Sequence, residues 1–251
     1  MTAAPLLSAR AMACLGLIAP LCWVQAAQGA VSVGGFVAMS SDYVLRGVSQ
    51  NGDDAALQGD VHLNLGSNWS FGVWGSEVKL THYRHSLELN PYVQWRRPLG
   101  EDFDFAVSAT GYVYPNDPRP IGYNYQELSV TAGWRDQLYA TVRFAPEVTL
   151  FSNFGFTGYG YELSRDTRVL NFEFSTHRTL RSHLDAVLGV AYYDPLGLDY
   201  ATYTYGSAAL DWHYGKWRAD LAWILVQGDN HRWYSQGPAG GPLTLTVAWN
   251  F

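Results

Sequence analysis

The sequence predicts an all-β protein, a transmembrane antiparallel β-barrel of about twelve strands with both chain termini on the periplasmic side. Three observations support this prediction. Apolar and polar residues alternate in about a dozen segments, the connections between those segments are alternately short and long, and the chain is rich in aromatic but poor in charged residues. Of the 251 residues, 15% are aromatic and 15% are charged. This balance is typical of a barrel that presents one face to lipid and the other to water.

The alternation is clearest at residues 55–65. Leu57 and Val61 would face lipid while Asp60 would face the lumen, because successive side chains of a strand point to opposite faces. The same division recurs at 87–96, 103–110, 127–134, 138–144, 170–175, 184–190 and 217–223, and less regularly at 31–45, 69–80 and 200–214. With the last segment, 243–251, these give about twelve strands near the ten-residue length that a tilted spanning strand requires.

The connections support the same count. Short turns are expected at 67–68, 100–102, 135–137, 179–182 and 215–216, and longer loops at 47–54, 81–85, 115–122, 152–166, 194–199 and 227–241. Short and long connections alternate without exception. Outer-membrane barrels have short periplasmic turns and long external loops. This asymmetry places both termini on the periplasmic side.

The N-terminal segment predicts export. Arg10 precedes an apolar stretch at residues 11–24, which is too short to cross a bilayer as a helix but fits the apolar region of a secretory signal peptide. We therefore predict a signal peptide at 1–26, with cleavage as late as Gly29 also compatible with the sequence, and the barrel at 31–251.

Both cysteines, Cys14 and Cys22, lie inside the predicted signal peptide. Neither follows a convincing lipoprotein box. The exported chain would then contain no disulfide and no thiolate metal site. The formal net charge of −6 also argues against nucleic acid as a partner.

The C-terminal segment, L-T-L-T-V-A-W-N-F at 243–251, has apolar residues at every second position. Trp249 and Phe251 fall where an aromatic belt at a bilayer interface is expected. A terminal Phe also resembles the signal by which the outer-membrane assembly machinery recognises its clients. We expect Trp249 and Phe251 to carry this assembly signal, and outer-membrane lipids and that machinery to be partners.

Several short motifs carry a family resemblance. Residues 41–50 are S-D-Y-V-L-R-G-V-S-Q, followed by A-L-Q-G at 56–59, G-V-W-G-S-E-V at 72–78, Y-V-Y-P at 112–115 and N-Y-Q-E-L at 124–128. This set resembles the TorF family of proposed porins, and the decapeptide, with Asp42, Tyr43, Arg46 and Gly47, is its most specific part. The resemblance implies a Gram-negative outer-membrane channel of unassigned substrate and supplies no catalytic residue. It leaves the roles of loops 152–166 and 227–241 open.

The decapeptide has two interpretations. Arg46 could be a cation at a pore constriction. Alternatively, the motif could be a turn and ladder device in which Gly47 relieves the backbone. We favour the second interpretation.

The lumen face of the expected strands carries ionisable side chains. We predict as pore-lining residues Asp60, Glu88, Arg96, Asp104, Glu127, Arg143, Glu173 and Arg218, and place Asp185 and Asp220 on the same face. Acids outnumber bases in this set. Structural pairing and a role in ion selectivity both remain open for these residues.

Tyrosine pairs recur near the external strand ends, at 112 and 114, 123 and 125, 159 and 161, and 192 and 193. An aromatic girdle at the membrane interface explains them better than a platform for stacking sugars.

Catalysis and metal binding are not expected. His177 and His183 flank Ser182 only in a predicted periplasmic turn, and no compact His and Ser pair occupies a lipid-facing strand position. His82 and His85 lack a third metal ligand at suitable spacing. We therefore predict no enzyme activity, no metal and no cofactor.

The expected function is passive diffusion of small hydrophilic solutes through an outer-membrane barrel with a weak preference for cations. A non-conducting structural or adhesin-type barrel, plugged by its own side chains, is the first alternative, because twelve strands lie between the filled eight-stranded and the wide sixteen-stranded barrels. A lipid-modifying barrel enzyme is the second. The sequence does not indicate the solute, an open lumen or the oligomeric state.

Overall fold

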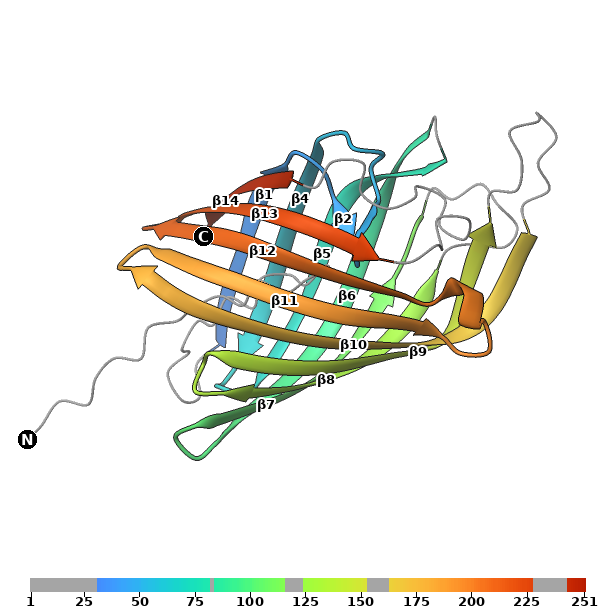
Figure 1. Ribbon diagram of the computed structural model, residues 1–251. Coiled ribbons are helices and arrows are strands. Elements are labelled where there is room, and N and C mark those ends of the chain that lie inside the picture. The colour runs from blue at the N-terminus through green and yellow to red at the C-terminus, as the bar shows by residue number, and fades with distance from the viewer. Residues whose placement is uncertain (1–30, 82–83, 116–123, 153–162, 228–242) are drawn as a thin grey trace, which may run out of the picture.

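The computed structural model describes residues 31–81, 84–115, 124–152, 163–227 and 243–251, so the predicted signal peptide lies outside them. Within these residues, twelve antiparallel strands close into a barrel (Figure 1). The barrel strands are β1 (Val31–Ser40), β4 (Ala56–Leu65), β5 (Trp69–Thr81), β6 (Arg84–Leu99), β7 (Phe103–Tyr112), β8 (Tyr125–Trp134), β9 (Leu138–Ser152), β10 (Leu163–Arg181), β11 (Leu184–Pro195), β12 (Tyr203–Tyr214), β13 (Trp217–Gln227) and β14 (Leu243–Asn250). The predicted antiparallel β-barrel and its twelve strands are confirmed.

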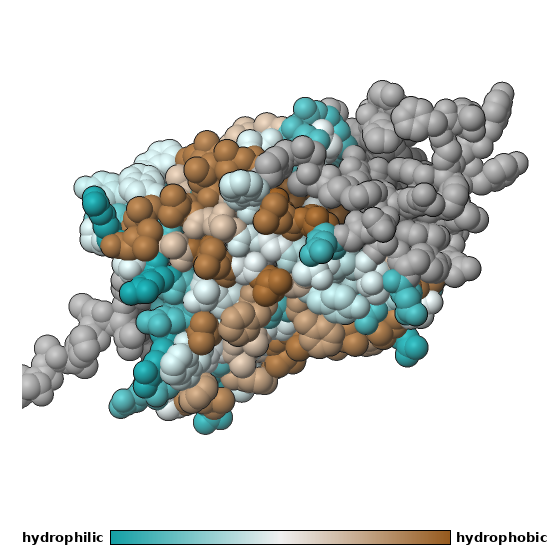
Figure 2. Space-filling model, viewed as in Figure 1, coloured by the Kyte–Doolittle hydropathy of each residue, from teal (hydrophilic) through white to brown (hydrophobic). Residues whose placement is uncertain are grey.

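The outer face of the barrel is apolar and the inner face is polar. In β4, Leu57 and Val61 are exposed while Asp60 and His62 are buried, as the period-two alternation predicts. Every barrel strand presents large exposed apolar side chains, and Figure 2 shows them on the visible wall of the barrel. Covering so much apolar surface with water would be unfavourable, so this wall suits a lipid environment. Among the described residues, no helix has the length and apolar character needed to cross a membrane.

The connections at one end of the barrel are short. They comprise residues 66–68, 100–102, 135–137, 182–183 and 215–216. Four of these five turns agree with the sequence prediction, whereas the turn expected at 179–182 lies slightly later because β10 continues to Arg181. The β8–β9 turn places both Arg135 and Asp136 at positive φ, as a tight hairpin turn between twisted strands requires.

The opposite end carries the other connections. Residues 196–202 include the short 3₁₀ helix η1 (Asp199–Ala201), and residues 41–55 connect β1 to β4. Two predicted loops are shorter than expected: β5 extends to Thr81 and β6 begins at Arg84, and β10 begins at Leu163. Both differences arise because the hairpin ladders continue past the part of each strand that alternates regularly. Most of loops 152–166 and 227–241 lies outside the described residues.

The barrel closes between the first and last strands, and this seam is short. β1 pairs with β4 over ten residue pairs, from Val31↔Leu65 to Ser40↔Ala56, but with β14 over only five, from Phe36↔Asn250 to Ser40↔Thr246. Phe251 lengthens the seam, because its backbone N–H donates to Gly35 O at 3.0 Å. An ideal Cβ on Gly35 would lie 2.7 Å from the Phe251 ring, so the ring occupies the space that glycine leaves.

Replacing Phe251 with Ser should therefore lower the amount of assembled barrel, because the aromatic contact at the short seam is lost. Assembly can be measured by the heat-modifiable mobility of the barrel on gels. Phe103→Ser is the matched control, since Phe103 is equally exposed (53% against 48%) but lies on β7, within the continuous ladder. Equal loss in both variants would show that the seam has no special importance.

Candidate pore constriction

Part of the decapeptide at residues 41–50 forms a small hairpin within the β1–β4 connection. β2 (Val44–Leu45) pairs with β3 (Val48–Ser49), and the two residues between them, Arg46 and Gly47, have φ values of 52° and 79°. Two successive residues at positive φ define the tight turn that matches strand twist, and glycine adopts this conformation without strain. The predicted role of Gly47 in a turn thus agrees with its backbone geometry.

This hairpin folds into the barrel instead of extending from its rim. Tyr43, Leu45, Arg46, Val48 and Ser49 are all less than 10% exposed, and β2 lies between the barrel walls in Figure 1. Surface loops normally expose such residues. The burial of a tyrosine and an arginine here means that the hairpin is packed against the interior wall.

Three side-chain contacts fix the hairpin. Tyr43 OH donates to Glu88 Oε1 on β6 at 3.1 Å, Arg46 Nη2 donates to Glu127 Oε2 on β8, and Tyr203 OH on β12 donates to Arg46 O at 3.0 Å. In the ring of twelve strands, β6 and β12 are six positions apart and so lie on opposite walls. The hairpin therefore spans the lumen.

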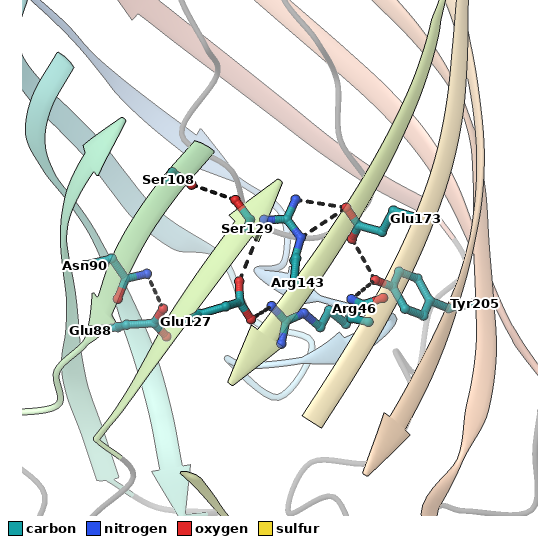
Figure 3. A network of polar contacts seen from close by, with 10 residues as sticks. Arg46, Glu88, Asn90, Ser108, Glu127, Ser129, Arg143, Glu173 and Tyr205 are labelled. Carbon is teal, nitrogen blue, oxygen red and sulfur yellow. Dashed lines mark hydrogen bonds and ion pairs between the residues drawn. The ribbon is translucent and has the colours of Figure 1, made fainter. Parts of the chain in front are cut away.

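The ion pair of Arg46 is the first step of a buried polar chain, shown in Figure 3. Glu127 Oε1 lies 3.7 Å from Arg143 Nη1, and Arg143 Nη2 donates to Glu173 Oε2 at 2.9 Å. Tyr205 OH then donates to Glu173 Oε1 at 2.8 Å. Charge thus alternates from the hairpin along β8, β9 and β10. Each buried charge has an opposite partner, which offsets the cost of removing it from water.

The position of Arg46 is compatible with both interpretations of the motif. Its backbone occupies the first turn position, and its guanidinium lies in the lumen beside Glu127. The Tyr193 ring adds a cation–π contact, with Arg46 Cζ 5.9 Å from its centroid. Spacing along the sequence could not reveal this, because Glu127 is 81 residues away.

The other predicted pore-lining residues form separate clusters. Asp60 Oδ1 lies 2.6 Å from His62 Nδ1 and forms no ion pair with an arginine of the described residues. Arg96 Nη2 lies 2.8 Å from Asp104 Oδ1 on the neighbouring strand. Arg218 Nη2 lies 2.7 Å from Asp211 Oδ2.

Sequence reasoning missed Asp211. Its strand was recognised only as an irregular segment, although the inward positions of β12 alternate from Tyr203 through Tyr205 to Asp211. This weak period-two signal, continued through Ser207 and Ala209, could have placed Asp211 on the lumen face.

Several tyrosines expected at the membrane interface face the interior instead. Tyr112 and Tyr125 stack with their ring centroids 4.2 Å apart, and Tyr112, Tyr114 and Tyr193 are all less than 10% exposed. The girdle interpretation is wrong for these residues. These tyrosines pack around the hairpin, and the Tyr193 ring also contacts the Arg46 guanidinium. Only Tyr192 is on the outer face, and residues 123, 159 and 161 lie outside the described residues.

The base of the hairpin carries a buried carboxyl group. Ser49 Oγ donates to Asp42 Oδ1 at 2.8 Å and lowers its pKa, but burial outweighs this hydrogen bond. Burial, reinforced by the nearby Asp53 and Asp54 carboxylates, raises the pKa of Asp42 to about 6. The docked hairpin thus disfavours the charged form of this side chain.

Among the described residues, His177 and His183 contact aromatic rings and do not pair with Ser182. His177 is buried and stacks on Tyr139, and His183 contacts the rings of His213 and Tyr214. No group of three or more metal-ligating side chains occurs among the described residues. Residue 82 and the side chain of residue 85 lie outside what the structure describes.

Comparison with known proteins places the chain in a family. Residues 24–237 match the family described as bacterial protein of unknown function, Gcw_chp. The chain belongs to this Gcw_chp family. The match does not name the TorF family, and no curated protein matches the chain significantly.

Two solved structures with a similar barrel fold are a porin and an outer-membrane channel. An outer-membrane channel from Pseudomonas putida F1 is 12% identical with a TM-score of 0.51, covering 94% of this chain and 100% of the other. The NanC porin is 10% identical with a TM-score of 0.51, covering 88% and 99%. At these identities the likeness concerns the fold alone.

The buried network of Arg46, Glu127, Arg143 and Glu173 leads to a prediction about the free energy of unfolding. Glu173→Gln leaves Arg143 with only Glu127, which it shares with Arg46, so two buried guanidinium groups then share one carboxylate. This should cost about 3 kcal/mol, because a buried positive charge is no longer balanced. Urea unfolding of the barrel in lipid vesicles measures this loss. Asp102→Asn is the control: it breaks the half-exposed Arg135–Asp102 pair, for which a cost of about 0.5 kcal/mol is expected. Similar costs in the two variants would contradict a dry, coupled network.

Proposed function

We propose that this protein is a porin-like channel of the outer membrane through which small hydrophilic solutes diffuse passively, without a chemical step or a cofactor. The observation that carries the proposal is a closed barrel with an apolar outer wall and a polar interior, across which the hairpin is fixed. A segment inside the lumen reduces its cross-section. The hairpin would then be the segment that restricts the path of solutes.

The proposal includes export and orientation. Residues 1–26 would be the signal peptide, both termini would be periplasmic, and Trp249 and Phe251 would carry the signal for the assembly machinery. Supporting this orientation, the five short turns gather at one end of the barrel and residues 41–55 and 196–202 lie at the other.

Single cysteines can test the orientation. Asp199→Cys places a thiol at the exposed first residue of η1, at the end opposite the short turns, and Glu101→Cys places one on an exposed short turn. A membrane-impermeant maleimide added to intact cells should label position 199 and leave position 101 unlabelled until the outer membrane is permeabilised. The reverse pattern would require the opposite orientation.

We also propose a weak preference for cations. Four acids of the interior wall, Asp104, Glu127, Glu173 and Asp211, are neutralised by arginines. Four others form no ion pair with an arginine or lysine within the described part of the chain: Asp60, Glu88, Asp185 and Asp220. An interior with surplus carboxylates has a negative potential, which attracts cations.

The reversal potential of the refolded protein in a planar bilayer measures this preference. A salt gradient around ~0.1 M should reveal modest cation selectivity that fades toward 1 M, where the Debye length is about 3 Å. Asp185→Asn combined with Asp220→Asn should weaken the selectivity while conductance persists, since charge is removed at nearly constant size. Asp102→Asn, on an exposed turn, should leave it unchanged. An anion preference in the wild type would mean that the arginines control permeation.

A non-conducting barrel is the second candidate, and one observation favours it. The lumen-facing side chains of Glu88, Glu127, Arg143 and Glu173 are all less than 10% exposed at the level of the hairpin. Side chains that exclude water so completely would also obstruct solutes. Absence of conductance from correctly folded protein, under all salt conditions, would favour this candidate.

A further inference from the structure

The contacts that Arg46 and Tyr43 make with the barrel wall suggest that the hairpin can open and close the lumen. We propose that residues 41–55 form a releasable plug, whose docking through Arg46 and Tyr43 closes the lumen and whose release opens it. This inference rests on the proposed channel function, because a gate requires a path to close. It concerns a different property, namely that the obstruction is a conformational state and not a fixed part of the wall.

The wall of the barrel does not depend on the hairpin. β1 pairs with β4 from Val31↔Leu65 to Ser40↔Ala56, so the two strands on either side of the segment are joined directly to each other. The hairpin ladder itself has only the pairs Val44↔Ser49 and Leu45↔Val48. An isolated two-stranded ribbon of this size is marginal in water. The segment can therefore leave the lumen without breaking the barrel ladder, and its docked position depends on its contacts with the wall.

Those contacts are both apolar and polar. Tyr43, Leu45 and Val48 pack among buried hydrophobic residues of the barrel strands, and a small set of polar contacts fixes the position of the hairpin. The polar contacts join the hairpin to strands around the ring: Arg46 to Glu127, Tyr43 to Glu88, and Tyr203 to Arg46 O. Residues 50–55, the outer arm of the segment, are held by Gln50 O, which accepts from the backbone N–H of Lys79 at 2.8 Å. Each of these polar contacts can be exchanged for a hydrogen bond to water. No covalent link holds the hairpin to the wall.

The docked state also carries unfavourable features. Arg46 is a non-glycine residue at a φ of 52°, and its Nε is buried without a hydrogen-bond partner among the described residues. Burial raises the pKa of Asp42 to about 6, so docking opposes the ionised form that water would favour at neutral pH. These costs reduce the advantage of docking over release. A small free-energy difference between two states is the condition for a switch.

The outer arm provides a place for the backbone to pivot. Gly52 and Asp53 both have positive φ, at 65° and 62°, and Asp53 and Asp54 are exposed. Hinges are commonly a few residues at the end of an element that absorb backbone rotation. Here the pivot would lie between the hairpin and the first residue of β4, Ala56.

Removing the arginine anchor tests the gate. Arg46→Ala should increase the open fraction of single channels in a planar bilayer at least several-fold, because the ion pair that holds the hairpin is lost. Arg96→Ala is the matched control, since it removes the same charge from the interior wall, where Arg96 pairs with Asp104 and not with the hairpin. Equal currents in the two variants would overturn the gate, because lumen charge alone would then explain the effect.

A covalent lock tests the opposite direction. An ideal Cβ on Gly47 would lie 2.5 Å from Val226 Cγ2 on β13, so paired cysteines at these positions would be close neighbours, at the cost of backbone strain from a side chain at the φ of 79°. The sequence has cysteines only at positions 14 and 22, both in the predicted signal peptide. Oxidised Gly47→Cys/Val226→Cys should suppress openings, and a reducing agent should restore them. Identical currents before and after reduction would overturn the gate.

Labelling of the hairpin provides a readout that does not need conduction. Val48 is 8% exposed, so Val48→Cys should react slowly with maleimide in the wild-type background and much faster with Arg46→Ala added, but not with Arg96→Ala. Unchanged labelling in Arg46→Ala would overturn hairpin release even if the wild type conducts. Faster labelling without any current would support release and overturn the proposed channel function.

Discussion

Closure of the backbone ladder is the constraint on which the rest of this structure depends. In lipid, each unpaired N–H or C=O group is costly, so a strand can span only if both of its edges are paired. The chain meets this condition with eleven consecutive hairpin-type pairings and one seam between its first and last strands. The seam contains the fewest residue pairs, and Phe251 and Gly35 extend it with a hydrogen bond and a close ring contact. Once the ring is closed, each side chain must face either the outer wall or the enclosed interior.

Closure inverts the distribution of polarity found in a soluble domain. Carboxylates and guanidinium groups are brought into a small volume, and those that are removed from water need partners. Arg46, Glu127, Arg143 and Glu173 meet this need as an alternating chain, while Asp104 and Asp211 pair with arginines of the wall. The same chain holds the hairpin, because one of its two arginines comes from the β1–β4 connection. Interior charge balance and the position of the hairpin are thus coupled through Glu127.

The hairpin illustrates how one short motif can satisfy two requirements. Gly47 allows the chain to turn within two residues, and this tight turn makes the ribbon narrow enough to enter the barrel. Arg46 then forms the ion pair with Glu127 on the barrel wall. The inward tyrosines surround this contact, with Tyr112 stacked on Tyr125 and Tyr193 below the guanidinium. Membership of the Gcw_chp family and the likeness to outer-membrane channels describe the chain and its fold, but the chemistry that would control permeation resides in these interior residues.

The sequence by itself determined the architecture, because the period-two alternation is a local property that can be recognised without knowing which residues are in contact. It placed Asp60, Glu88 and Glu173 on the face opposite Leu57, Leu87 and Phe174, and it predicted twelve strands from turn spacing. Only the tertiary structure decided which interior residues meet. Glu127 and Arg46 are far apart in the sequence, and the inward direction of Tyr112 and the entry of the hairpin depend on packing inside the closed ring. Alternation fixes the face of each side chain, whereas its partner is fixed by barrel register and by the few buried charges that must be neutralised.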